Sequence, residues 1–248
     1  MKPPDLRRLR ATWYLKALSF GSPDAPPLVF RDVDLRERPD HPTRRFDLTV
    51  QPESVVVAIG DEASGVLDLG RWALGLGRPP AGRVEVFGAP IAALHYYDLL
   101  LFRRRIGYHP IGDGLLQNLT LRDNVALPLR FASDHRQAEV DGRVGQLVED
   151  FRLRSVATLR PAQANEEDCR RAALARAVAL DPDLVVLETP FDGLTSRAAQ
   201  ELLEKVSRRE DGTRRAVFAT VQDLIPAVRR TVHRVIKVVD GTAVEEAP

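Results

Sequence analysis

Apolar runs separated by polar turns divide the chain into short segments that predict alternating strands and helices. Val55–Ile59 and Leu184–Leu187 are unbroken apolar runs, which is typical of strands buried on both faces of a parallel sheet. Leu28–Leu35 and Phe46–Val50 alternate apolar and polar residues, so each is predicted to be a half-exposed strand. Together with the helical segments between them, these strands predict an α/β fold.

A helix is predicted directly before the second buried strand. Asn165 is a suitable N-cap residue for it. Leu174, Ala177 and Val178 then recur at helical spacing and give one apolar stripe. Pro182 ends the pattern, because proline cannot continue the backbone hydrogen bonding of a helix.

The ends of the two buried strands carry candidate chemistry. The loop 60–65 follows the first strand directly and begins and ends with glycine, and Val66–Leu74 is then predicted to be a helix. A strand, a glycine-bounded loop and a helix form the layout of a P-loop. Glu188 follows the second strand, at the position where open α/β sheets place their ligands.

Weaker patterns cover the rest of the chain. Residues 1–27 are predicted to be an N-terminal extension, and residues 28–248 one domain. An Asp-Gly pair between two apolar runs predicts a hairpin near the C-terminus. The remaining predictions are a strand at Arg83–Phe87, a helix at Ala198–Val206, a strand at Arg215–Val221, a helix at Asp223–Val232 and the hairpin Val235–Val239 with Thr242–Val244.

Composition narrows the class of protein. The chain has 248 residues, of which 44% are hydrophobic and 29% charged, so a globular fold is expected. The net charge of +1 argues against a nucleic-acid-binding protein. Cys169 is the single cysteine and is expected to be inert. No stretch approaches the roughly 20 apolar residues of a membrane span, and no signal peptide is expected.

Phosphate binding by a P-loop requires the pattern G-x-x-x-x-G-K-[ST], whose lysine reaches the phosphates and whose hydroxyl holds Mg²⁺. Val66 and Leu67 occupy those two positions here. The missing lysine removes a hydrogen bond worth about 1.5–3 kcal/mol. A carboxylate about 4 Å from a phosphate repels it by up to about 4 kcal/mol at an effective dielectric constant near 20. The prediction is a turn without a ligand, with weak nucleotide binding as the alternative. The loop comprises Gly60, Asp61, Glu62, Ala63, Ser64, Gly65, Val66 and Leu67.

Residues 170–194, RRAALARAVALDPDLVVLETPFDGL, resemble the signature-helix and Walker B region of ABC-transporter ATPase subunits. The family pattern is LSGGQ, a helix ending in ALARAL, and DPDLLLLDEPFSGLD. The resemblance extends from about Phe30 to the C-terminus. It implies a P-loop NTPase-like fold with an antiparallel β subdomain, a mostly parallel central sheet and a helical subdomain at about 112–170.

The resemblance also shows where the chain departs from the family. The metal-contacting glutamine of the family corresponds to Ile111, its Walker B aspartate to Glu188, its catalytic carboxylate to Thr189 and its switch histidine to Gln222. No suitable general base stands at position 189. The signature is replaced by Ala164, Asn165, Glu166, Glu167 and Asp168, the D-loop aspartate by Thr195 and the adenine-stacking aromatic by Glu37.

These departures predict a catalytically degenerate subunit with no catalytic residue, no metal and no cofactor, ATP and Mg²⁺ being disfavoured. Because the family's sites combine the P-loop of one subunit with the signature of another, loss of both halves leaves a homodimer without a working site. A heterodimer with an active paralogue would hold two sites, each lacking one half. A structural or regulatory role is therefore expected.

The segment DNVALPLR at 123–130 most resembles the ATPases of Mce/Mla-type lipid transporters. That likeness implies a membrane-embedded permease, a second nucleotide-binding subunit, lipid-transport components and a cytoplasmic location at the inner membrane. The permease is expected to dock in a groove that includes Ile111, Leu115, Leu116 and Leu119, although core packing would explain these leucines equally well.

Two further functions stay open. The first is an active or weakly active ABC ATPase that energises transport, with an unusual site around Glu188 and Gln222. The second is a soluble adaptor that uses the fold only for protein contacts. His109 lies near the same site, and a structural role is favoured for it over that of an acid or base.

Overall fold

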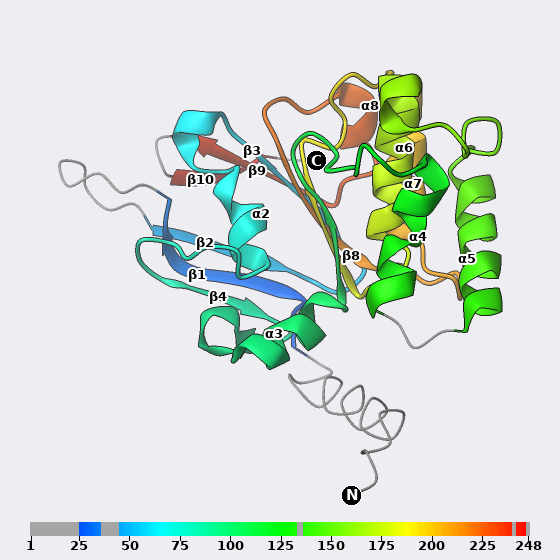
Figure 1. Ribbon diagram of the computed structural model, residues 1–248. Helices are drawn as coiled ribbons and strands as arrows, with labels where there is room; N and C mark the ends of the chain where they lie inside the picture. Colours follow the sequence, from blue (N-terminus) through cyan, green and yellow to red (C-terminus); the bar gives the residue numbers. More distant parts are fainter. Residues whose placement is uncertain (1–24, 36–44, 133–135, 240–241, 247–248) are drawn as a thin grey trace, which may run out of the picture.

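The computed structural model describes residues 25–35, 45–132, 136–239 and 242–246, and it contains two sheets with helices on both sides (Figure 1). The larger sheet has the strand order β10-β9-β3-β8-β7-β6. All its neighbouring strands are parallel except β10, which pairs with β9 in an antiparallel hairpin. Its strands are β3 (Val55–Ile59), β6 (Ile106–His109), β7 (Leu184–Glu188), β8 (Ala216–Val221), β9 (Arg234–Val239) and β10 (Thr242–Glu246).

The smaller sheet is antiparallel and has the order β2-β1-β4-β5. Phe30 and Phe46 pack edge to face within it, with ring centroids 5.8 Å apart. Phe30 also lies 5.6 Å from Phe218 of β8, so the two sheets share one apolar layer. Its strands are β1 (Leu28–Asp34), β2 (Arg45–Val50), β4 (Arg83–Val86) and β5 (Ala89–Pro90).

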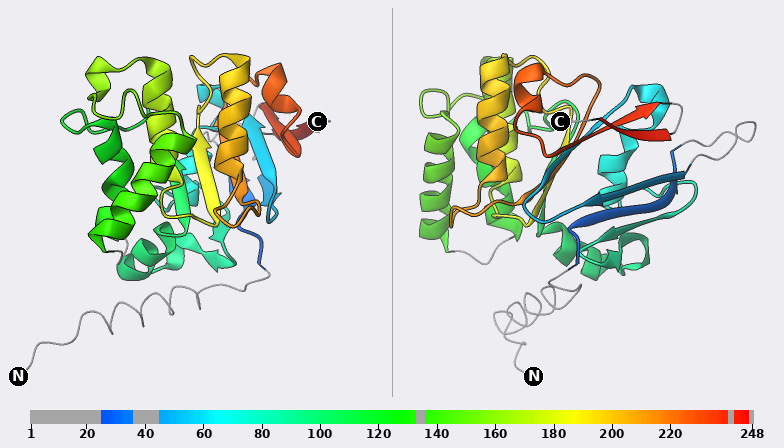
Figure 2. Two further views of the ribbon diagram at one scale, coloured as in Figure 1. Left: turned by 90° about the vertical axis from the view of Figure 1, so that its right-hand side faces the viewer. Right: turned by 180° about the vertical axis from the view of Figure 1, so that it is seen from behind.

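The longer helices cover the opposite face of the larger sheet, as both views in Figure 2 show. They are α4 (Leu121–Ala132), α5 (Gln137–Asp150), α6 (Glu166–Ala177) and α7 (Ser196–Ser207), with the short α8 (Pro226–Arg229) beside α7. The short helix α2 (Asp68–Ala73) lies on the side of the smaller sheet and contacts β4, β7 and β8, and α3 (Tyr96–Arg103) contacts β6.

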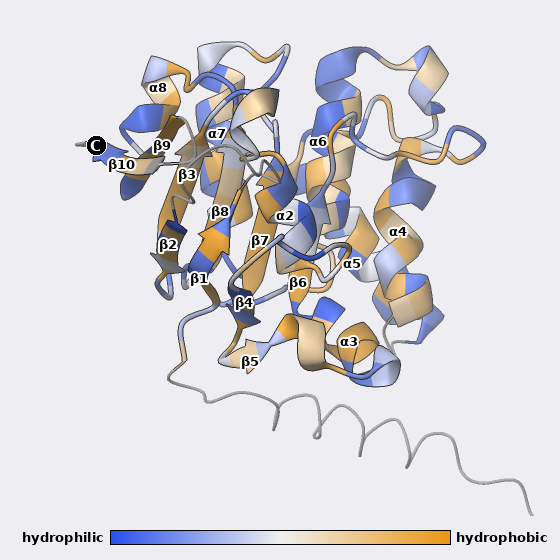
Figure 3. Cartoon of the chain, turned by 90° about the vertical axis from the view of Figure 1, so that its left-hand side faces the viewer, coloured by the Kyte–Doolittle hydropathy of each residue, from blue (hydrophilic) through white to orange (hydrophobic). Residues whose placement is uncertain are grey.

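Hydropathy explains this layering. Every residue of β7 is buried, whereas β2 alternates between buried and exposed positions. The central strands accordingly appear as hydrophobic bands in Figure 3. These observations confirm the predicted α/β fold with an antiparallel sheet, a mostly parallel central sheet and several helices.

Two predicted helices are wrong in extent. The helix expected at Val66–Leu74 begins only at Asp68, because the preceding residues form a 3₁₀ turn at Glu62–Ser64 and a further turn. The helix expected at Asp223–Val232 shrinks to α8. Pro226 is its first residue, and a residue before proline is disfavoured in helical conformation.

Some predictions lie outside the described residues or are not tested by them. These include nearly all of the N-terminal extension 1–27, position Glu37 and the Asp240-Gly241 turn, although the two strands of that hairpin are confirmed. The domain limits, including the helical subdomain at about 112–170, stay predictions. Within the described part of the chain, no helix is long and apolar enough to cross a membrane.

Candidate functional site

Three of the predicted site segments meet beside the carboxyl ends of the central strands. The backbone N–H of Ile111, after β6, donates to Oε2 of Glu188 at the end of β7 over 3.2 Å. Gly70 of α2, the helix after the P-loop-like turn, faces the same carboxylate, and a Cβ at that position would lie 2.6 Å from Oε1. The structure therefore brings α2, Glu188 and Ile111 into one site.

The polar groups of the glycine-bounded loop form hydrogen bonds with one another. The carboxylate of Asp61 accepts a hydrogen bond from the Ser64 N–H at 2.8 Å, and the Ser64 hydroxyl donates to the Asp61 carbonyl at 2.6 Å. The Ser64 hydroxyl in turn accepts from the Val66 N–H at 3.3 Å. Ser64 is 1% exposed and its hydroxyl lies directly against Gly60. The N–H groups of Ser64 and Val66 thus already have acceptors from within the loop.

Apolar side chains occupy the lysine and hydroxyl positions of the P-loop pattern, and both are at least partly buried. Val66 is fully buried in the apolar layer that α2 shares with both sheets. Leu67 is half-buried and precedes the first residue of α2. Neither side chain offers a cation or an oxygen to a phosphate or a magnesium ion.

Glu188 is 2% exposed, and its two carboxylate oxygens differ in their hydrogen bonding. Oε2 accepts the Ile111 N–H, whereas Oε1 has no hydrogen-bond partner among the residues that the structure describes. Burial raises the pKa of Glu188, while the Tyr108 hydroxyl, the Ile111 N–H and the positive charge of Arg71 oppose the rise. The same contact, with burial as the larger cause, raises the pKa of Tyr108. No cluster of three or more His, Cys, Asp or Glu side chains suited to a metal occurs among the described residues.

Three further positions that correspond to site residues of the family lie just after strands or at the start of a helix. Thr189 is buried and has a positive φ of 43°, which is unusual for a β-branched residue. Its N–H donates to the Thr220 carbonyl at 2.8 Å. Gln222 is exposed in a bend after β8. Thr195 is the N-cap of α7 and accepts a hydrogen bond from the Ala198 N–H at 3.3 Å.

The signature-like turn caps its own helix. Asn165 is confirmed as the N-cap of α6, accepting from the Asp168 N–H at 2.8 Å. Glu167 pairs with Arg171 at 2.7 Å, one turn further along. Glu166 lies against Gly193, where a Cβ would approach its carboxylate to 2.6 Å. Burial and the charge of Glu167 raise the pKa of Asp168.

His109 is structural, and it belongs to a buried polar cluster that the sequence patterns do not indicate. His109 is fully buried, and its ring nitrogens contact the Glu188 carbonyl at 3.2 Å and Asp113 at 3.0 Å. Asp113 also contacts Arg170 of α6 at 2.5 Å. Periodicity could not reveal this cluster, because its residues lie up to 79 positions apart and Asp113 falls in an irregular segment.

The predicted docking groove stays a prediction, and its four residues differ in exposure. Leu115 is 8% exposed and belongs to the core, and Leu119 is half-buried, whereas Ile111 and Leu116 are exposed. A groove of about 420 Å³ lies between α3, the start of β6 and the C-terminal parts of α4 and α6. Its walls include Leu100, Arg103, Arg104, Tyr108, Phe131 and Arg176.

The site does not fit a magnesium–triphosphate group. Two of its loop amides have internal acceptors, its lysine position is apolar and buried, and its magnesium-holding hydroxyl is replaced by Leu67. Glu188 is a carboxylate that could hold a metal, and it faces Gly70. Its contacts connect the sheet to α2 and to the segment after β6.

Comparison with known proteins gives the evolutionary context. The family model "ABC transporter" matches residues 43–192. The chain is 31% identical over 208 residues to the methionine import ATP-binding protein MetN 2 of Pseudomonas aeruginosa, covering 83% of this chain and 60% of that protein. It is 32% identical over 223 residues to MetN of Caulobacter vibrioides, covering 88% and 66%. The chain thus spans about 60% of the length of the first of these relatives.

Solved structures show the same fold at lower identity. The dimeric ATP-binding cassette MJ0796, in a post-hydrolysis state bound to ADP and phosphate, aligns with a TM-score of 0.76 and 23% identity, covering 88% of this chain and 97% of that one. The cbiO1 protein of Clostridium perfringens, part of an ABC transporter complex, aligns with a TM-score of 0.72 and 15% identity over 88% and 87% of the two chains.

The branch prediction finds no support in these relatives. They are named for methionine import, so the Mce/Mla-type lipid-transport assignment drawn from 123–130 is not upheld. That motif covers most of α4, where Asn124 is buried and donates to the Leu116 and Thr120 carbonyls, so this residue connects the helix to the segment before it. The family model covers more than half of the chain and agrees with the two-sheet fold, and on this evidence the chain belongs to the ABC transporter family.

Proposed function

We propose that this protein is a transporter subunit that docks on an integral-membrane permease and does not itself hydrolyse ATP. The observation that carries the second part is the closed loop 60–66, in which Asp61 and Ser64 occupy the hydrogen-bonding groups that would hold a phosphate. Thr189 at the position of the catalytic carboxylate supports the same conclusion, because threonine cannot act as a general base at neutral pH. The role is therefore mechanical or regulatory.

The groove between α3 and α4 is the proposed permease-docking surface. Leu100 is 41% exposed on one wall and Phe131 is 80% exposed on the other, although both are apolar. Arg103, Arg104 and Arg176 also line the groove, and its described lining contains no Asp or Glu. Apolar anchors and cationic walls suit a short helix that presents carboxylates beside apolar side chains.

The remaining parts of the role follow from membership of the family. We infer a cytoplasmic location, peripheral to the membrane through the permease, and a second nucleotide-binding subunit as partner. An importer of amino acids or similarly small polar solutes is the proposed transport system, because the relatives are named for methionine import. The charges suggest that the second subunit is a different chain. In a homodimer the acidic turn 166–168 would have to face the loop that holds Asp61.

An ATP-hydrolysing subunit is the second candidate. Relatives that are about 31% identical over most of this chain carry the name ATP-binding protein, which favours ATP-driven import. This candidate requires Glu188 to act in place of the family's Walker B aspartate and Gln222 in place of its switch histidine. It also requires the loop 60–66 to open and release the Asp61–Ser64 hydrogen bonds.

Phosphate release by the assembly purified from membranes distinguishes the two candidates. The proposal predicts that the permease copurifies with this chain and that turnover is unchanged by the Glu188→Ala substitution. A fall in turnover to background in that variant would establish the ATP-hydrolysing function instead. Failure of any multi-span protein to copurify would reject permease docking. The Arg208→Ala variant, at an exposed position directly after α7, serves as the control.

A further inference from the structure

A buried polar cluster connects the irregular segment 110–119, after β6, to α6 and to the end of β7. We name the side chains His109, Asp113, Arg170 and Arg176 the latch. His109 is fully buried, and Asp113 and Arg170 are 9% and 5% exposed. Such buried charges are costly unless each is paired.

Asp113 is the centre of the latch. Its Oδ1 contacts His109 Nε2 at 3.0 Å and Arg170 Nε at 2.5 Å. Its backbone carbonyl accepts from Arg176 Nη2 at 2.6 Å, and the neighbouring Gly114 carbonyl accepts from Arg176 Nη1 at 2.7 Å. Two arginines of α6 therefore hold two successive residues of the segment.

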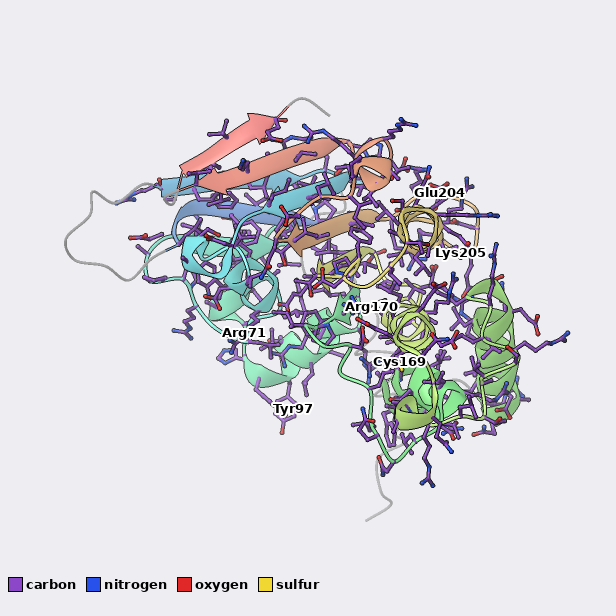
Figure 4. The ribbon with its side chains drawn as sticks, turned by 90° about the horizontal axis from the view of Figure 1, so that it is seen from above. Arg71, Tyr97, Cys169, Arg170, Glu204 and Lys205 are labelled. Carbon is purple, nitrogen blue, oxygen red and sulfur yellow. The ribbon has the colours of Figure 1, made fainter. Side chains whose placement is uncertain are left out.

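Arg170 extends the connection to the strand end. Its Nη1 donates to the Thr189 carbonyl at 2.7 Å, and His109 Nδ1 contacts the Glu188 carbonyl at 3.2 Å. Figure 4 shows Arg170 where α6 faces the central sheet, while Tyr97 projects outward from α3. Arg170 thus connects Asp113 to Thr189, the residue at the position of the family's catalytic carboxylate. The positive φ of Thr189 is held in place by this contact and by its own N–H bond to Thr220.

We propose that the latch holds the segment 110–114 closed against α6 without any nucleotide, and so fixes the helices and the central sheet in one relative position. The proposal goes beyond permease docking and does not depend on it, because every contact is internal to the chain. It also connects two sites physically, since Arg176 lines the groove of 420 Å³ while it bonds to Asp113 and Gly114.

Leu116, which lies in the second half of the segment 110–119, provides an internal reference for the effect of losing the latch. The Leu116 N–H donates to Oδ1 of Asn124 at 2.7 Å, and the Asn124 amide donates to the Leu116 carbonyl at 3.1 Å. Asn124 belongs to α4 and is fully buried. Loss of the latch should therefore free residues 111–114 and leave Leu116 anchored, whereas general destabilisation would affect both.

Residue-resolved hydrogen exchange by NMR on the full chain tests the latch. Arg170→Met should speed exchange of the Asp113 and Gly114 amides by roughly tenfold or more, with Leu116 and the β3 amides changed less than about twofold. Arg171→Met is the matched control, because Arg171 is the next residue of α6, is equally buried and pairs with Glu167. It should leave Asp113 and Gly114 unchanged.

Further variants keep the outcome decisive. Should Arg170→Met prevent folding, Asp113→Asn keeps the shape and removes the charge, and it should give the same selective pattern. Excess Mg-ATP should leave the wild-type exchange rates unaltered. Fast exchange of Asp113 and Gly114 in the wild type would overturn the proposal. So would equal acceleration of Leu116 in every foldable variant, or slowing of the segment by Mg-ATP.

Discussion

Gly70 of α2 faces the carboxylate of Glu188 across the space between helix and strand. A Cβ there would lie 2.6 Å from Oε1 and 3.0 Å from Cγ. Glu188 cannot swing aside freely, because it is 2% exposed and its other oxygen accepts the Ile111 N–H. This contact holds α2 directly against the carboxylate of Glu188.

Gly70→Ala should therefore lower the free energy of unfolding by about 1–3 kcal/mol through overpacking. Gly142→Ala in α5 is the control, because no atom lies within 4 Å of its added Cβ. It should stabilise the protein by about 0.5–1 kcal/mol through helix propensity. Urea unfolding measures both, and equal effects of the two substitutions would contradict the close contact.

Glu188 also gives a pH prediction. Its pKa is raised in the folded state by burial, from an ordinary value of 4.5. Between the pKa of the unfolded state and that of the folded state, the folded protein binds one more proton at Glu188 than the unfolded protein does. The stability that this proton contributes is therefore complete below pH 4.5 and is lost as the pH rises through the folded pKa.

Glu188→Gln removes that titration. The free energy of unfolding of the variant minus that of the wild type should therefore increase as the pH rises from about 4.5 to 7. The increase should be at most about 1.4 kcal/mol per pH unit. Unfolding curves at matched pH values give the difference, in which the other carboxylates cancel. A gap that is constant or shrinks with pH would mean that the carboxylate is not destabilised by burial.

Among the elements, the turn between β3 and α2 decides whether phosphate can bind. Its residues follow the glycine spacing of a P-loop, yet the helix begins at Asp68 and Ser64 fills the interior of the turn. Restoring the family lysine at Val66 would place an ammonium group in an apolar layer.

Val66→Lys should therefore destabilise the protein by about 3 kcal/mol or more and should not create nucleotide binding. Ala63→Lys adds the same charge at an exposed position of the same loop and should change stability by less than about 0.5 kcal/mol. Thermal unfolding with and without Mg-ATP measures both effects. A Val66→Lys protein that is stabilised by Mg-ATP would show that only the lysine was missing.

The elements also show how far sequence patterns reach. The runs of β3 and β7 and the N-cap Asn165 were predictable, because burial on both faces and helix capping leave local signatures. The closure of the loop 60–66 was not, because Ser64 and Asp61 are compatible with many turns. The Asp113–Arg170 pair was also beyond reach, because a contact across 57 positions has no periodicity.

At the scale of the whole molecule, the described residues include an exposed apolar surface beside a groove. Phe131 and Leu100 are exposed on opposite walls of an arginine-lined groove. Large exposed apolar side chains beside a cavity are typical of a contact with another protein. Both side chains project from helices whose cores are formed by other residues, so they contribute little to folding.

Phe131→Asp should accordingly abolish copurification of the permease, by adding a carboxylate where an acidic partner is expected, while the melting temperature stays unchanged. Val244→Asp is the control, because Val244 is 53% exposed on β10 and does not line the groove. Pull-down from detergent-solubilised membranes reports the result. Retention of the permease by the Phe131→Asp variant would exclude the groove as the docking surface.

Direct measurement of nucleotide affinity tests the central claim, which is that the phosphate loop is closed on Asp61 and Ser64. Isothermal titration of the isolated chain with Mg-ATP should give no saturable binding, while the Pseudomonas aeruginosa methionine import protein binds under the same conditions as a positive control. Saturable, magnesium-dependent binding that is lost when Gly65 is replaced by valine would contradict the account.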